Sequence, residues 1–142
     1  MKNVIRILLA CVLTCPFIVS CSRNSNDILG EISPIVTSGD WHVSLFSERG
    51  VNETSDFSGY SFLFQSDGKL IVNKGGTLQK EGTWVEDKSS HKLIIDLGVK
   101  SDANKPLGEL TDDWVITGKS ETKISLTDDN SSRNEILEFS RN

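Results

Sequence analysis

The chain has 142 residues, with 15 Lys and Arg against 20 Asp and Glu, which gives a formal net charge of −5. This acidic balance argues against a nucleic-acid-binding protein, because such proteins present basic patches to the phosphate backbone. All three cysteines lie within the first 21 residues, so the body of the chain has no disulfide framework and no CxxC redox or zinc motif.

The N-terminal segment has the pattern of an export signal. Lys2 and Arg6 form a positive region, and an uncharged stretch runs from there to Arg23. That stretch is shorter than the about 20 apolar residues that a membrane-spanning helix requires. It ends in Ile18-Val19-Ser20-Cys21, which resembles the lipobox of bacterial lipoproteins. The resemblance implies cleavage before Cys21, fatty acylation such as palmitate on that residue, and anchoring in a membrane.

The other two cysteines leave alternatives for the cleavage site. Leu8-Leu9-Ala10-Cys11 also resembles a lipobox, but cleavage there would leave only residues 7–10 as an apolar core. Leu13-Thr14-Cys15 has the larger Thr before its Cys and is followed by Pro16. An ordinary cleaved signal with incidental cysteines is a further alternative.

These patterns divide the chain into three parts. We expect a signal peptide over residues 1–20, the lipidated Cys and a flexible polar tether over 21–38, and one domain over 39–142. By resemblance to lipoprotein sorting rules, Ser22 after the Cys favours the outer membrane of the cell envelope. Whether the protein faces the periplasm or the cell surface stays open.

From Gly39 onward apolar and polar residues alternate with a period of two between turn signals, which is typical of strands. Most connections are too short for the crossover of a dozen or more residues that parallel strands need. We therefore predict an all-β domain, a single antiparallel up-and-down barrel of about eight strands, with an open two-sheet β-sandwich as the alternative. The predicted inward positions are Trp41, Val43, Leu45, Tyr60, Phe62, Phe64, Leu70, Val72, Trp84, Leu93, Ile95, Leu97, Trp114, Ile116, Ile124, Leu126, Leu137 and Phe139.

Some apolar residues fall on the opposite phase and are predicted to face outward. Gathered on adjacent strands they would mark a protein-contact patch, whereas scattered they would mean little. The only connection long enough for a short helix or an ordered lid runs over residues 100–111. The outward residues are Phe46, Leu63, Ile71, Ile94 and Val115.

Gly39-Asp40-Trp41 resembles the G-x-W that opens the first strand of lipocalins. The resemblance implies that Trp41 closes the barrel floor and packs against Arg141 near the end of the last strand. The whole body is similar to small lipocalin-like lipoproteins of Bacteroidota, on the segments 57–62 (FSGYSF), 82–84 (GTW), 106–114 (PLGELTDDW) and 134–139 (NEILEF). Gly39, Trp41 and Arg141 are thus expected to form a structural barrel floor.

We expect no catalytic residues, no metal site and no cofactor. His42 and His91 are the only imidazoles, and both are predicted to point to solvent, away from any nucleophile. The pairs Asp112-Asp113 and Asp128-Asp129 lack the spacing and the Gly of a calcium loop. They are interpreted as solvated loop acids.

The aromatic residues share the inward phase and have two interpretations. They fill the barrel as an ordinary core, or some of them line a cavity for one small ligand, which an eight-stranded barrel can hold. The expected function is a monomeric, membrane-anchored, non-catalytic binding module for a small apolar ligand or an envelope protein. The alternative is a protein-interaction or inhibitor lipoprotein with a packed barrel. The residues that would face a ligand are Tyr60, Phe62, Phe64, Trp84 and Trp114.

Overall fold

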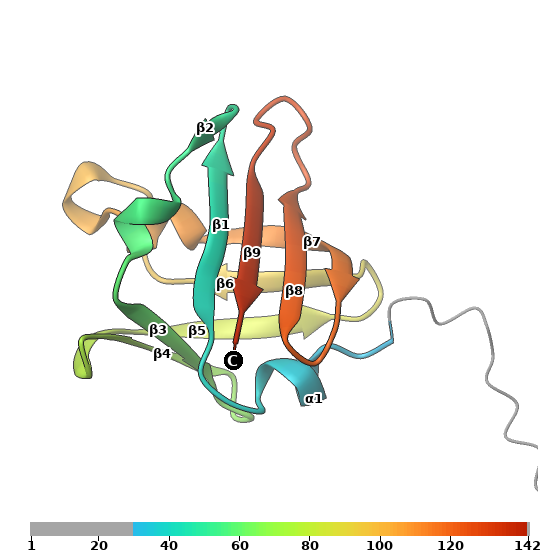
Figure 1. Ribbon diagram of the computed structural model, residues 1–142. Coiled ribbons are helices and arrows are strands. Elements are labelled where there is room, and N and C mark those ends of the chain that lie inside the picture. The colour runs from blue at the N-terminus through green and yellow to red at the C-terminus, as the bar shows by residue number, and fades with distance from the viewer. Residues whose placement is uncertain (1–29, 142) are drawn as a thin grey trace, which may run out of the picture.

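The computed structural model describes residues 30–141, and all secondary structure below lies in that range. Nearly all of it is β-structure (Figure 1). The residues predicted for the signal peptide, Cys21 and the start of the tether lie outside the described residues. The elements in chain order are α1 (Ser33–Val36), β1 (His42–Glu48), β2 (Val51–Asn52), the 3-10 helix η1 (Thr54–Phe57), β3 (Tyr60–Phe64), β4 (Lys69–Lys74), β5 (Thr77–Asp87), β6 (Lys92–Asp96), the 3-10 helices η2 (Asp102–Asn104) and η3 (Leu107–Leu110), β7 (Asp112–Lys119), β8 (Lys123–Asp128) and β9 (Ile136–Ser140).

The nine strands form one antiparallel sheet in the order β2-β1-β9-β8-β7-β6-β5-β4-β3. From β3 to β9 each strand pairs with the next, and β1 then pairs with β9. The sheet curls into a half-barrel, so that β6 and β7 cross behind β1, β9 and β8 (Figure 1). This confirms the predicted single antiparallel meander, and the alternative two-sheet sandwich does not apply.

Among the described residues, one isolated backbone bridge joins the segment before β1 to β3. Trp41, just before β1, exchanges two backbone hydrogen bonds with Phe62 of β3, at N···O distances of 2.9 and 2.8 Å. Farther along β1, η1 lies over the gap and inserts Phe57 against Phe46, with ring centroids 5.2 Å apart. The half-barrel is therefore closed at one end by strand pairing and on its side by a short helix.

A bulge in β1 changes which of its residues face inward. Val43 pairs with Phe139 of β9 and Leu45 with Glu138, so Ser44 is an extra residue without a partner. Beyond it the alternation is inverted, and Phe46 is only 1% exposed whereas Leu45 is half-buried. The prediction that Phe46 faces outward is therefore wrong, because strict alternation takes no account of the inserted residue.

The folded domain also begins earlier than residue 39. Ile32, which precedes α1, and Val36, its last residue, are fully buried in the core. They lie four residues apart and so project from the same side of the helix. Residues 32–36 thus belong to the domain, and the predicted flexible tether cannot extend through them.

Glu86 of β5 holds the start of α1. Its carboxylate accepts hydrogen bonds from the amides of Ile32 and Ser33, at 2.7 and 3.0 Å, and from the Ser33 hydroxyl. Partial burial acts to raise the pKa of Glu86, but these hydrogen bonds outweigh it and lower the pKa below its usual value of 4.5. The ionised form is therefore the one that stabilises the folded state.

We expect Glu86→Gln to lower the free energy of unfolding by about 1–2 kcal/mol at neutral pH, because an amide accepts these hydrogen bonds less strongly. A group whose pKa is depressed on folding stabilises above its unfolded pKa and loses that contribution as the pH falls through its folded pKa. The difference between wild type and variant should thus shrink below about pH 4.5. Urea titrations at several pH values measure it. Glu81→Gln, on the exposed side of β5, is the control, and a difference that persists in acid would contradict the assignment.

Candidate functional site

The five aromatic residues expected to face a ligand all point into the half-barrel. Phe62 and Trp114 are fully buried, and Phe64, Trp84 and Tyr60 are 1%, 6% and 8% exposed. They belong to one cluster of 22 buried hydrophobic residues that fills the space inside the sheet.

These rings contact one another and the last strand. Phe64 packs edge-on against Trp84 and against Phe139, with centroids 5.7 and 5.6 Å apart, and Phe62 packs edge-on against Phe139 at 5.4 Å. Such edge-to-face packing is the geometry that aromatic cores prefer. The indole N–H groups are also occupied, since Trp84 donates to the carbonyl of Gln65 and Trp114 to that of Leu110. The rings therefore form a packed core.

A depression of about 620 Å³ lies between the end of α1 and the end of β3, with Phe64 in its lining. Thr37, at the end of α1, forms one side, and residues 63–67, from the end of β3 into the following turn, form the other. Asp67 and Ser66 are exposed there, and Leu63 is half-buried. The depression is broad and open to solvent, so it differs from the enclosed apolar cavity that the ligand hypothesis requires.

The residues predicted for the floor lie together at the end of the half-barrel next to α1. Trp41 is fully buried, and its indole N–H donates to the carbonyl of Val36 at 2.8 Å. The guanidinium carbon of Arg141 lies 5.1 Å from the centroid of the Trp41 ring, within cation–π range.

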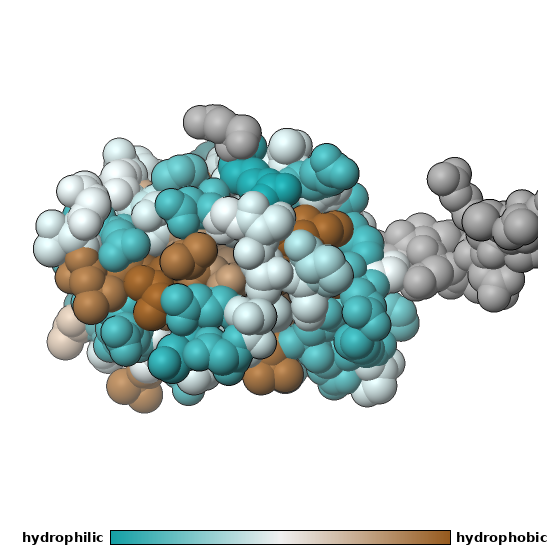
Figure 2. Space-filling model, turned by 90° about the horizontal axis from the view of Figure 1, so that it is seen from below, coloured by the Kyte–Doolittle hydropathy of each residue, from teal (hydrophilic) through white to brown (hydrophobic). Residues whose placement is uncertain are grey.

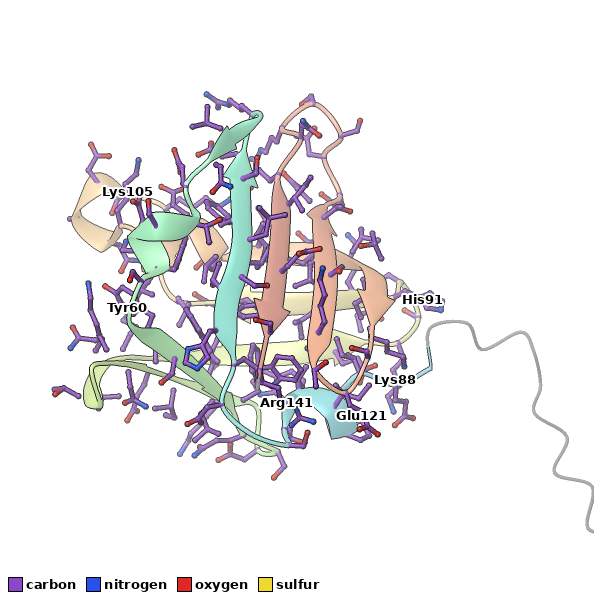
Figure 3. All side chains as sticks on the ribbon, in the orientation of Figure 1. Tyr60, Lys88, His91, Lys105, Glu121 and Arg141 are labelled. Atoms are coloured by element: carbon purple, nitrogen blue, oxygen red, sulfur yellow. The ribbon has the colours of Figure 1, made fainter. Side chains whose placement is uncertain are left out.

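Arg141, which follows β9, also joins its own segment of the floor to two others. It donates hydrogen bonds to the carbonyl and hydroxyl of Ser38 and to the carbonyl of Glu121. Figure 3 shows Arg141 and Glu121 close together beside α1. Gly39 has φ +145°, and a Cβ there would lie 3.3 Å from Arg141 Nη1. Glycine at this position therefore leaves room for the guanidinium.

The opposite end of the half-barrel, the mouth, carries three acidic side chains whose oxygen atoms lie within 4.8 Å of one another. Asp112 begins β7, Asp128 ends β8, and Glu135 directly precedes β9. Their side chains are 13%, 1% and 5% exposed. We call these three residues the mouth carboxylates.

Two basic side chains from neighbouring loops reach the mouth carboxylates. Lys100 Nζ lies 2.9 Å from Asp112 Oδ2 and 3.4 Å from Glu135 Oε2. Arg133 Nη1 lies 3.2 Å from Asp112 Oδ2 and 3.6 Å from Asp128 Oδ2. Three carboxylates thus face two cations, and the two most buried acids have the longer contacts.

The pKa values of Asp112 and Glu135 shift in opposite directions. For Asp112, burial acts to raise the pKa, but the hydrogen bonds from Lys100 and from the Asp113 amide, together with the charges of Lys100 and Arg133, lower it overall. Burial raises the pKa of Glu135; the Lys100 charge opposes this, and Asp128 adds to the rise. The contacts with Lys100 and Arg133 therefore favour the ionised form of Asp112, whereas burial and the neighbouring Asp128 disfavour ionisation of Glu135.

The two Asp pairs of the sequence are thus split between inside and outside. Asp113 and Asp129 face outward and both bind Lys92, with Nζ···Oδ2 distances of 2.8 and 2.7 Å. Asp112 and Asp128 face inward, so their interpretation as solvated loop acids is wrong. A signal was present in the sequence, because Asp112 and Asp128 lie two residues from Trp114 and Leu126, and Glu135 two residues from Leu137. Alternation places residues two apart on the same face.

The two imidazoles are both exposed. His42 lies at the start of β1, where its Nδ1 is 2.8 Å from the carbonyl oxygen of Tyr60. His91 lies in the turn between β5 and β6 and is directed away from the body of the protein (Figure 3). Within residues 30–141 neither imidazole forms a hydrogen bond to a Ser or to an acidic side chain.

Comparison with known proteins places the fold and leaves the function open. No protein family and no curated protein matches the chain. The fold is similar to the crystal structure of a DUF4847 family protein from Bacteroides vulgatus ATCC 8482, with a TM-score of 0.58 and 17% sequence identity. The match covers 79% of this chain and 98% of that protein. At this identity the likeness establishes the shared half-barrel fold alone. Within the described residues, no helix has the length and apolar character needed to cross a membrane.

Proposed function

We propose that the chain is a membrane-anchored, non-catalytic lipoprotein of the cell envelope, with a lipocalin-like domain that binds another protein through its outer surface. The observation that carries this proposal is the packing of Phe62, Phe64 and Trp84, which contact one another or Phe139 where a ligand cavity would be. Aromatic rings in mutual contact leave less room for a small apolar ligand between them than an open cavity would. The anchor is the lipobox ending at Cys21.

A non-catalytic role is supported by the positions of the groups that acid–base catalysis would need. His42 and His91 lie on separate elements, and among residues 30–141 neither is hydrogen-bonded to a nucleophile or to an acid that could orient it. The mouth carboxylates are held by Lys100 and Arg133, so their negative charge is directed to cations. Neither arrangement provides a nucleophile–base pair.

The outer surface offers apolar side chains to a partner. Val85 and Ile94 are directly paired across β5 and β6 and are 56% and 37% exposed. Leu63 and Ile71 are likewise paired across β3 and β4 and half-buried. Figure 2 shows apolar atoms grouped at one side of the underside among hydrophilic ones. Exposed apolar pairs on adjacent strands are typical of protein-contact surfaces.

Native mass spectrometry tests the proposal. The full chain carrying Cys21→Ser, produced in its own host and recovered from the soluble envelope fraction, should show the mass of the polypeptide without a bound small molecule. A retained small-molecule mass would overturn the packed-barrel function and identify the ligand directly.

Cell fractionation tests whether Cys21 carries the lipid anchor. The wild-type chain should stay in the membrane fraction and Cys21→Ser should be released from it, because acyl chains supply the membrane affinity. Cys11→Ser and Cys15→Ser are the matched controls and should remain with the membrane. Release of Cys11→Ser together with retention of Cys21→Ser would move the lipidation site to Cys11 and contradict the assignment.

A further inference from the structure

The strongest feature that the proposed function does not use is the group of mouth carboxylates. Asp128 Oδ2 is buried and has no hydrogen-bond partner among the described residues. Its nearest cation is Arg133 Nη1 at 3.6 Å, which is beyond hydrogen-bonding distance. The other oxygen, Oδ1, accepts the amide N–H of Asn130 at 2.8 Å, so the side chain is held in place. Oδ2 faces Arg133 Nη1, the same nitrogen that lies 3.2 Å from Asp112 Oδ2.

A buried carboxylate oxygen without a hydrogen bond is costly, because it has lost water and gained only a longer charge contact in exchange. Glu135 lies beside it, 5% exposed, and its one cationic neighbour, Lys100, is 3.4 Å away. Proteins resolve such an arrangement by pairing the acids or by binding a metal ion. The orphan oxygen therefore indicates a missing cation between Asp128 and Glu135.

The geometry points to a Ca²⁺ site formed by Asp112, Asp128 and Glu135. We infer that Ca²⁺ binds there and displaces the ammonium of Lys100. All three ligands are carboxylates, which hard divalent cations prefer, and the site lies at the junction of three separate chain segments. Oxygen atoms up to 4.8 Å apart can share one Ca²⁺, whose Ca–O distances are about 2.3–2.6 Å. The smaller sphere of Mg²⁺, with distances of about 2.0–2.1 Å, fits that spacing less well.

The charges favour the exchange of Lys100 for Ca²⁺. Three carboxylates with Lys100 and Arg133 leave one negative charge in excess, whereas three carboxylates with Ca²⁺ and Arg133 are balanced. Lys100 is 31% exposed and lies in the connection between β6 and β7, so its flexible side chain has solvent to move into. It acts as an internal competitor for the site. This inference goes beyond the proposed function and does not depend on it.

Thermal unfolding and calorimetric titration with CaCl₂ test the site in the purified full-chain protein. With a Kd of about 10⁻⁴–10⁻³ M, typical of extracellular Ca²⁺ modules, about 10 mM CaCl₂ should raise Tm by roughly 5–10 °C over a chelated sample at equal ionic strength. Asp128→Asn should abolish the rise. Asp129→Asn, the neighbouring acid that binds Lys92 outside the site, is the matched control and should keep it.

Lys100→Gln provides a second test, in which Ca²⁺ affinity should rise and not fall. This test does not depend on whether Asp128→Asn folds. Removal of the competing ammonium should tighten Ca²⁺ binding by about tenfold or more, whereas a purely structural ion-pair network would show no such gain. The inference is overturned if the wild-type Tm does not respond to CaCl₂, if Asp128→Asn and Asp129→Asn respond alike, or if Lys100→Gln binds Ca²⁺ no more tightly than wild type.

Discussion

Replacing Trp41 with Ala should lower the free energy of unfolding by about 3–5 kcal/mol, the usual cost of deleting a large aromatic side chain from a core. Trp41 is fully buried, its indole N–H is bonded to Val36, and its ring lies against Arg141. The backbone pairing of residue 41 with Phe62 does not need the side chain. The loss should therefore measure the floor packing itself.

Urea or thermal unfolding of three variants separates the contributions. Trp41→Phe keeps most of the ring but leaves the Val36 carbonyl without its donor, and should cost about 1–2 kcal/mol. Val85→Ala, at an exposed strand position, should change stability by no more than about 0.5 kcal/mol. A loss below about 1 kcal/mol for Trp41→Ala would show that this residue is not the plug of the floor.

Period-two alternation was enough to predict the class of the fold and most of the core. Strands of four to eight residues with one apolar face have few ways to pair when their connections are short, so the antiparallel meander followed from loop length and phase. Alternation failed at Ser44, because a bulge is an insertion in one strand relative to its partner and leaves no mark in the strand's own sequence. Phe46 was therefore assigned to the wrong face.

The closure of the sheet depends on contacts distant in sequence. Phe57 of η1 covers the gap beside β1, and Ile32 of the N-terminal segment enters the core from beyond the first predicted strand. Both residues lie in segments without a strand pattern. Their burial is decided by the shape of the opening that the strands leave, which a single sequence does not describe.

The acidic residues at the mouth show a different limit of prediction from sequence. The sequence places Asp112, Asp128 and Glu135 on the same side of their strands as buried apolar residues. Because charged residues are rarely buried, Asp112 and Asp128 were assigned to loops. Only the structure brings the three ends together and places Lys100 and Arg133 among them. The outer pair, Asp113 and Asp129, binds Lys92 on the opposite face of the same strands.

Gly82→Ala should be the most damaging change of a single methyl group, with an expected loss of about 3 kcal/mol. A Cβ at Gly82 would lie 2.2 Å from the carbonyl oxygen of Asp96 and 2.7 Å from a methyl carbon of Leu97. The first of these atoms is backbone, in the strand paired with β5, and cannot move without disturbing the β5–β6 ladder. Glycine is thus required at position 82 because β5 and β6 approach each other closely, and not because of an unusual φ.

Gly118→Ala in β7 is the matched control, because a Cβ there would meet only the Ser125 side chain, at an ordinary 3.6 Å. It should leave stability unchanged or raise it by up to about 1 kcal/mol, since Ala loses less backbone entropy than Gly on folding. Denaturant unfolding of both variants, with hydrogen exchange of the β5 and β6 amides, measures the effect and where it acts. Equal stability of Gly82→Ala and Gly118→Ala would contradict the close approach of the Asp96 carbonyl and the Leu97 side chain to Gly82.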